Sequence, residues 1–128
     1  MNYDELVKIA VDSKEKSYSP YSGFRVGAAV IAGSGKVYTG VNIENSSFGA
    51  TVCAERTAVF KAVSEGEKRI EAIAIASDSE KTVYPCGICR QVLCEFGRED
   101  MKVICSRSDK SYEVYSLEDL LPKAFKEF

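Results

Sequence analysis

The sequence contains no histidine, and this absence restricts the chemistry that the chain can perform. A Ser-His-Asp triad and a Cys-His pair both need an imidazole, so neither mechanism is available here. A zinc site in this chain must likewise draw its ligands from thiolates and carboxylates. Any active site has to be built from the other titratable side chains.

The sequence also lacks long apolar runs and concentrated positive charge. No stretch approaches the roughly 20 apolar residues that a membrane-spanning helix needs. The formal net charge is −2, without runs of like charge, whereas a nucleic-acid or membrane-surface protein would need a basic patch. The first residues, Met-Asn-Tyr-Asp-Glu-Leu, are acidic where a signal peptide would be basic. We therefore expect a cytoplasmic protein with no nucleic-acid and no membrane partner.

The composition is that of a globular protein. The 128 residues, 45% of them hydrophobic and 28% charged, suit a single domain spanning 1–128. The five cysteines are an odd number, and disulfides rarely persist in a reducing compartment. Metal ligation or simple burial is the better explanation for them.

The spacing of apolar residues predicts alternating helices and strands. Helices are expected at 2–18, 53–65, 87–96 and in a short segment from 116, which starts with the capping-box-like sequence Ser116-Leu-Glu-Asp119. Strands are expected at 24–32, 36–43, 70–76, 101–105 and 112–115. In the helix 87–96 we expect Ile88, Val92, Leu93 and Phe96 to face the core. The order predicts an α/β fold with one mixed sheet, helices on both faces, and largely parallel pairing in the middle of the chain.

Two short cysteine motifs stand at the starts of predicted helices. They are Cys53-Ala54-Glu55-Arg56 and Pro85-Cys86-Gly87-Ile88-Cys89-Arg90. A helix N-terminus carries partial positive charge, which lowers the pKa of a thiol, and the thiolate is the form that binds metal. Two helix starts that each follow a loop leaving the sheet can meet in one crevice. The motifs together therefore predict a shared site.

Three thiols and one carboxylate suggest a catalytic zinc site with one ion per chain. Cys53, Cys86 and Cys89 would be the ligands, and the open fourth position could hold a water whose pKa the metal lowers. Glu55 is then the candidate acid/base. Because it lies two residues after Cys53, that cysteine must precede or begin the first turn for both side chains to reach one pocket. Three thiolates also leave excess negative charge, which an arginine following either motif could balance.

Simpler interpretations exist for each part of this pattern. A Cys-x-x-Cys pair alone also fits a thiol redox protein, which holds no stoichiometric metal, or half of a structural zinc site. A structural zinc-binding interaction module would ligate its metal fully with protein and leave Glu55 in solvent. Cys-x-Glu joined to Pro-Cys-x-x-Cys is, however, the signature of zinc nucleobase deaminases, in which three cysteines are a known ligand set. Cys94 and Cys105 occupy apolar positions and are expected to be small buried residues.

Beyond these motifs, the sequence resembles the small, zinc-dependent, three-cysteine cytidine deaminases of pyrimidine salvage over essentially its whole length. The matching stretches are 19–29 (SPYSGFRVGAA), 40–45 (GVNIEN), 53–58 (CAERTA), 85–92 (PCGICRQV) and 120–125 (LLPKAF). The resemblance implies a three-layer cytidine deaminase-like fold with a mixed five-stranded sheet. It also implies a homotetramer with active sites at subunit interfaces.

The resemblance further implies hydrolytic deamination of cytidine and 2′-deoxycytidine to uridine and 2′-deoxyuridine, with release of ammonia. Hydroxide on the zinc would attack the base, with Glu55 as the proton shuttle. The other implied roles are ribose binding (Asn42, Glu44), packing on the nucleoside (Phe24), further substrate contact (Ala54), reaching a neighbouring subunit's site (Phe125) and hydrogen bonding to ligand thiolates (Arg56). Without the resemblance, the two phenylalanines would be assigned to the core and Asn42 and Glu44 to a strand end and turn.

Two details of the resemblance leave room for variation. Phe48 stands where many members of that family carry tyrosine, so a hydroxyl group is missing there. Deaminases of modified cytosine nucleosides, such as blasticidin S, share the Pro-Cys-Gly-x-Cys-Arg-Gln-Val stretch and remain an alternative. The sequence Asn42-Ile43-Glu44-Asn45 favours recognition of an ordinary ribose.

Overall fold

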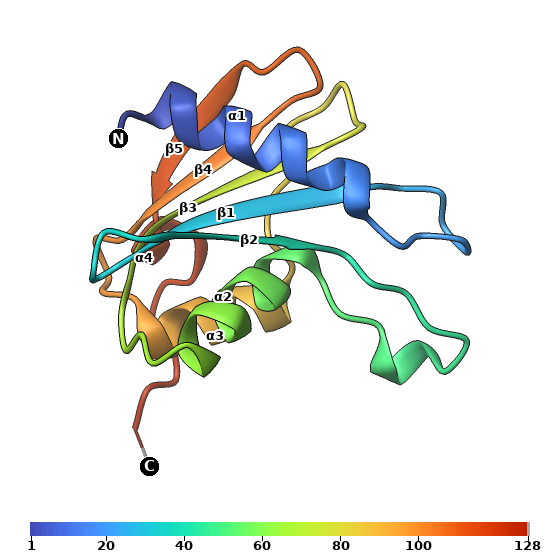
Figure 1. The fold of residues 1–128 in the computed structure, drawn as a ribbon. Helices are drawn as coiled ribbons and strands as arrows, with labels where there is room; N and C mark the ends of the chain where they lie inside the picture. The colour runs from blue at the N-terminus through green and yellow to red at the C-terminus, as the bar shows by residue number, and fades with distance from the viewer. Residues whose placement is uncertain (128) are drawn as a thin grey trace.

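A mixed sheet of five strands in the order β2-β1-β3-β4-β5 forms the centre of the molecule (Figure 1). The computed structural model describes residues 1–127. Its strands are β1 (Val26–Ala32), β2 (Val37–Val41), β3 (Ile70–Ser77), β4 (Lys102–Ser106) and β5 (Tyr112–Ser116). The predicted mixed five-stranded sheet is thereby confirmed.

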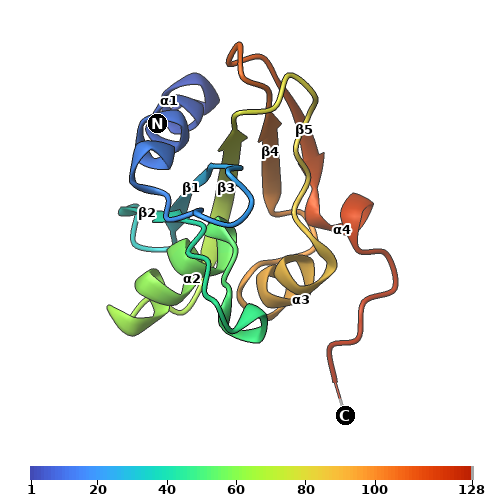
Figure 2. The same ribbon diagram turned by 90° about the vertical axis from the view of Figure 1, so that its right-hand side faces the viewer.

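Helices cover both faces of this sheet and give the molecule three layers (Figure 2). Helix α1 (Tyr3–Ser13) packs on one face, and α2 (Ala54–Ser64) and α3 (Gly87–Phe96) lie together on the other. A short helix, α4 (Leu117–Leu120), follows β5 and begins with the capping box predicted at Ser116 and Asp119. No helix in the described part of the chain is long and apolar enough to cross a membrane.

The pairing of the strands differs in part from the sequence prediction. Only β3 and β4 pair in parallel, whereas β1 pairs antiparallel with both β2 and β3. Strand β1 lies between β2 and β3, so the crossover through α2 passes over it and the two strands it joins are not neighbours. A pattern of helices and strands predicts strand direction, but it does not say which strand lies between two others.

Element ends also shift where local hydrogen bonds compete with the regular pattern. Helix α1 ends at Ser13 and continues as a 3-10 turn (Lys14–Lys16), short of the expected end at residue 18. Strand β1 starts at Val26 and not at 24, because the carbonyl of Phe24 accepts from the Asn42 side chain and the Arg25 N–H donates to Asp78. A 3-10 turn (Phe48–Ala50) interrupts the loop that the sequence predicted before α2.

Two glycines allow the helices to approach the sheet closely. A Cβ atom on Gly40 in β2 would lie 2.3 Å from the backbone nitrogen of Ala58 in α2. A Cβ atom on Gly27 in β1 would lie 2.3 Å from the carbonyl oxygen of Ala10 in α1. Each contact is far below van der Waals separation, so both layers depend on the missing side chain.

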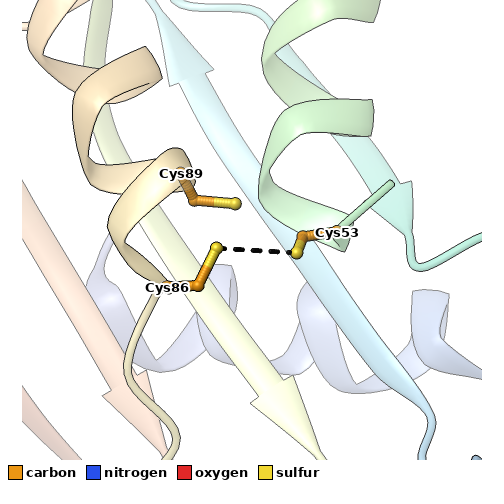
Figure 3. A group of neighbouring side chains, drawn as sticks. All are labelled: Cys53, Cys86 and Cys89. Atoms are coloured by element: carbon orange, nitrogen blue, oxygen red, sulfur yellow. Dashed lines mark hydrogen bonds between the residues drawn. The ribbon is translucent and has the colours of Figure 1, made fainter. Parts of the chain in front are cut away.

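Helix α3 faces the core as expected, with Ile88 as the exception. Leu93 is fully buried, and Val92 and Phe96 pack against the core. Ile88, predicted to face the core, is instead 62% exposed, and the fully buried residue in the first turn is Cys89. The Cys89 side chain points toward the start of α2 (Figure 3).

Candidate active site

Three cysteine side chains converge between the N-terminal ends of α2 and α3 (Figure 3). Cys53 and Cys86 are the N-cap residues of the two helices, both with extended backbone, and Cys89 lies in the first turn of α3. The Sγ atoms of Cys53 and Cys86 are 3.7 Å apart, and all three sulfurs lie within 4.8 Å of one another. The structure thus brings together the three cysteines that the sequence singled out.

The arrangement of these sulfurs fits a zinc ion. Zinc–sulfur bonds of about 2.3 Å in tetrahedral geometry separate two sulfurs by about 3.8 Å, close to the distance between Cys53 and Cys86. Among residues 1–127, the potential metal-binding group consists of these three cysteines alone. Three protein ligands are typical of a catalytic zinc, since a structural zinc generally has four.

Arg56 contributes positive charge to this cluster. Its Nη2 donates a hydrogen bond to the Sγ of Cys53 at 3.4 Å. Arg90, the other candidate for charge balance, donates instead to the backbone carbonyls of Pro85 and Leu120. The rotation of each helix against the sheet decides this difference, which sequence spacing left open.

The sulfur cluster shifts the acidity of its own members. A hydrogen bond from the thiol of Cys89, with a further contribution from Arg56, lowers the pKa of Cys53 to about 5. The same hydrogen bond and burial raise the pKa of Cys89. One sulfur in the metal-free cluster is therefore already a thiolate at neutral pH, which is the form that binds metal.

Glu55 is a buried carboxyl group beside the cluster. Its side chain belongs to the first turn of α2 and the residue is only 4% exposed. Burial is the main cause that raises its pKa to about 7, and the negative charge of Cys53 adds to the effect. Because Cys53 is the N-cap, both residues line one pocket, as the sequence argument required. A carboxyl with a pKa near neutrality is suited to accept and return a proton.

The pocket over Glu55 has a volume of about 290 Å³. Its lining includes Cys53, Cys86 and Glu55 together with the polar side chains of Asn42 and Glu44. Its remaining lining residues are Ser22, Phe24, Val26, Thr51, Val52, Ala54, Val83 and Tyr84. A larger groove of about 590 Å³ between α1, β2 and α2 contains no cysteine, so the chemistry favours the smaller pocket.

Asn42 and Glu44 hold the loop of residues 17–25 against this pocket. The Asn42 side chain accepts from the Val26 N–H at 3.0 Å and donates to the Phe24 carbonyl at 2.8 Å. Glu44 accepts from the N–H groups of Tyr21 and Ser22 at 2.9 and 3.1 Å. Since the Ser22 hydroxyl also donates to the other carboxylate oxygen of Glu44 at 2.5 Å, these bonds leave one amide hydrogen of Asn42 and about one lone pair of Glu44 for a ligand. The two residues therefore shape the pocket as well as line it.

Of the remaining predicted site residues, two line the pocket and one does not. Phe24, 39% exposed, and Ala54 line the pocket. Phe125, 63% exposed, does not line the pocket of its own chain, although its carbonyl accepts from Gln91. Phe48 is 76% exposed and packs edge-on against Tyr21 at 6.0 Å. Their roles in binding stay predictions.

Tyr84 is a lining residue that the sequence argument did not assign. Its ring packs edge-on against Tyr115 at 5.8 Å, and its hydroxyl donates to Glu113 at 3.4 Å. The sequence could have indicated this role, because Tyr84 directly precedes Pro85-Cys86. A residue so close to a metal ligand is expected to line the same pocket.

Comparison with known proteins finds relatives that share one description. Residues 1–106 match the family model described as the cytidine and deoxycytidylate deaminase zinc-binding region. The chain is 48% identical to a probable cytidine deaminase of Dictyostelium discoideum, over 99% of this chain and 88% of that protein. It is 46% identical to a cytidine deaminase of Halalkalibacterium halodurans, over 98% of this chain and 95% of that protein.

Solved structures show the same likeness. The crystal structure of cytidine deaminase from Burkholderia pseudomallei superposes with a TM-score of 0.93 at 42% identity, covering 98% of this chain and 100% of that one. Cytidine deaminase from Mycobacterium tuberculosis superposes with a TM-score of 0.87 at 37% identity, over 99% of each chain.

Proposed function

Because this chain belongs to the cytidine and deoxycytidylate deaminase family, a family of zinc-dependent enzymes, we propose that it deaminates cytidine and 2′-deoxycytidine in pyrimidine salvage. The products are uridine and 2′-deoxyuridine, with one water consumed and one ammonia released per turnover. We place this activity in the cytoplasm.

One observation carries the proposal: two thiols of the three-cysteine cluster and a buried carboxyl group line a pocket that Asn42 and Glu44 also line. Cys53, Cys86 and Cys89 would hold the zinc. When bound there, zinc supplies a Lewis acid that lowers the pKa of water and so provides a nucleophile near neutral pH. The side chain of Arg56 offsets part of the negative charge of the sulfurs by donating to Cys53.

Glu55 moves the protons of the reaction. Its pKa of about 7 allows it to take a proton from the attacking water at neutral pH. In its neutral form it then donates to N3 of the cytosine ring, and a further proton transfer converts the amine at C4 into ammonia. Burial keeps this carboxyl out of bulk water, so the same proton can be accepted and returned within one cycle.

The rest of the pocket orients the nucleoside. Phe24 packs against the nucleoside and Ala54 contacts it, since both residues line the pocket. Asn42 and Glu44 bind the ribose hydroxyl with the hydrogen-bonding capacity that the loop leaves free. The loop contacts preorganise these groups before substrate arrives, which lowers the entropic cost of orientation.

The assembly we propose is a homotetramer with active sites at subunit interfaces. Phe125 would enter the site of a neighbouring subunit, consistent with its exposure and its distance from the pocket of its own chain. Phe48 and Phe24 add exposed aromatic surface around the pocket. Aromatic residues are enriched in the buried cores of protein interfaces.

The test combines ultraviolet absorbance of cytidine with the zinc content of the purified protein. We expect loss of the cytidine absorbance with about one zinc per chain, because three ligands form one site. Zinc without turnover of cytidine or deoxycytidine, but with turnover of blasticidin S, would replace the substrate assignment. Zinc without turnover of any of the three would favour a structural zinc module, and absence of zinc from reduced protein would refute the metal site.

A further inference from the structure

We propose that Asp78 is a positioning residue for the nucleoside pocket, which acts through Arg25 to fix the place of Phe24. Asp78 follows the last residue of β3 and does not line the pocket. Its carboxylate contacts a residue 53 positions earlier in the sequence, directly after Phe24. The inference rests on the proposed function, since it concerns how the same pocket holds its substrate.

Asp78 and Arg25 form a bidentate pair with a third bond to the backbone. The Nε of Arg25 donates to one carboxylate oxygen at 2.9 Å and its Nη2 donates to the other at 3.0 Å. The backbone N–H of Arg25 also donates to Asp78, at 3.3 Å. Bidentate charged pairs have a defined geometry, so this contact fixes both the side chain and the main chain of Arg25.

Two further charges make the cluster electrically neutral. Arg25 also pairs with Glu15 at 2.9 Å, and the ammonium group of Lys14 lies 3.3 Å from Asp78. The Lys14 side chain is only 11% exposed and also donates to the Ser77 carbonyl at 3.3 Å. The two cations stabilise the ionised carboxylate and so lower the pKa of Asp78. The hydrogen bond from Arg25 is the main cause. The cluster joins the end of α1, the start of β1 and the end of β3.

The cluster adds to the contacts that hold Phe24 itself. Asn42 binds the carbonyl of Phe24, and the hydroxyl of Ser22 accepts from its N–H at 3.0 Å. Asp78 binds the next residue, so Phe24 is held from both directions along the chain. Without Asp78, Arg25 keeps only its exposed pair with Glu15, and Phe24 itself is held by Asn42 and Ser22 alone.

Asp78 also begins a segment that contributes lining residues to the pocket. Residues 78–85 run from β3 to Cys86 and include Val83 and Tyr84, which line the pocket. One carboxylate therefore couples the loop that carries Phe24 to the segment that carries a metal ligand. We expect its loss to weaken substrate binding while the chemical groups stay in place.

The experiment compares Arg25→Gln and Asp78→Asn with the wild-type, zinc-loaded protein. Both variants should raise KM for cytidine about tenfold and keep kcat within about twofold, because a loosened Phe24 weakens binding and leaves Glu55 and the thiols unchanged. The double variant should raise KM by less than the product of the two single effects, since the two variants share the loss of the Arg25–Asp78 pair but each also loses a contact of its own, with Glu15 or with Lys14. Zinc content should not change.

Two control variants separate positioning from stability. Arg69→Gln removes an exposed pair with Glu71 at the other end of β3 and should leave KM unchanged. Lys14→Met removes the buried ammonium group but leaves the Arg25–Asp78 pair, so it should lower the melting temperature without the KM effect. Arg25→Gln keeps the partly buried pair between Lys14 and Asp78. This variant should therefore stay folded and test the inference even if Asp78→Asn is unstable.

Hydrogen–deuterium exchange gives a reading that does not depend on activity. Amides in residues 17–26 should exchange faster in both test variants than in wild type and in Arg69→Gln. An unchanged KM with unchanged exchange, or equal losses of zinc and kcat in both test variants, would overturn the inference. If wild-type protein fails to deaminate cytidine, the proposed function fails, and the exchange data alone decide whether Asp78 anchors the loop.

Discussion

The close approach of α2 to β2 makes Gly40→Ala a sensitive test of how the fold supports the metal site. The new Cβ would lie 2.3 Å from Ala58 N and 2.5 Å from Ala54 O, where ordinary contact begins at 3.4 Å. Both neighbours are backbone atoms of α2, so rotating a side chain cannot relieve the overlap. The helix and the strand must therefore separate by about 1 Å, which we derive from these distances.

Such a displacement affects stability and metal binding together. Overpacked cores typically lose about 1–3 kcal/mol, and we expect the upper end here because the clash is with main chain. Helix α2 carries Cys53 at its N-cap, whereas Cys86 and Cys89 belong to α3. A shift of about 1 Å is large beside the roughly 0.2 Å tolerance of metal–ligand distances, so zinc affinity should fall as well.

The assays are urea denaturation for the free energy of unfolding and competition with a chromogenic chelator for zinc affinity. Gly49→Ala is the matched control, because its Cβ meets nothing within 4 Å and should change neither quantity. Gly27→Ala overlaps α1 on the opposite face, at 2.3 Å from Ala10 O, and should lose stability but keep its zinc affinity. The reasoning is refuted if Gly40→Ala behaves like Gly49→Ala, or if Gly27→Ala weakens zinc binding equally.

Further predictions address the chemical groups themselves. Glu55→Gln should retain zinc and lose about 10²–10⁴-fold in kcat in steady-state assays, and turnover near the wild-type rate would contradict its role as proton shuttle. Cys86→Ala should lose zinc and lower the melting temperature together in metal analysis and calorimetry, while Cys94→Ala should keep its zinc. In metal-free protein at pH 7, Cys53, with a pKa lowered to about 5, is a thiolate, whereas burial raises the pKa of Cys105 to about 12. Iodoacetamide should therefore modify Cys53 before Cys105, and the rate of Cys53 modification should fall only as the pH drops through 5. Equal labelling of the two thiols by mass spectrometry would show that Cys53 is not the thiolate.

Local sequence signals predicted most of the elements because their causes are local. The helix expected at 87–96 coincides with α3, and the capping box at Ser116 and Asp119 forms as expected. Both depend on residues within one or two turns of each other. The strands that pair with the two edges of β1, in contrast, include one that is distant in the sequence. The periodicity of apolar residues does not indicate which strands pair with each other.

The same distinction applies to the candidate site. The spacing of the two cysteine motifs was sufficient to predict the thiol cluster, since each motif begins a helix. Whether Arg56 or Arg90 reaches the sulfurs depends on how each helix is rotated against the sheet, which is settled by packing. The contact between Arg25 and Asp78 joins residues with no sequence pattern in common, so only the folded structure reveals it.

The central position of β3 has a consequence for the order of events in folding. Cys53 precedes the helix that leads into β3, and Cys86 follows the loop that leaves it. We therefore expect the three sulfurs to meet only after β3 has paired with β1, which requires non-local pairs such as Val26 with Ser77. Pairings of this kind form slowly, because distant chain segments must first be brought together. Capture of zinc by all three thiols is then a late step of refolding, and a chain with misplaced strands can offer the ion only the adjacent Cys86 and Cys89.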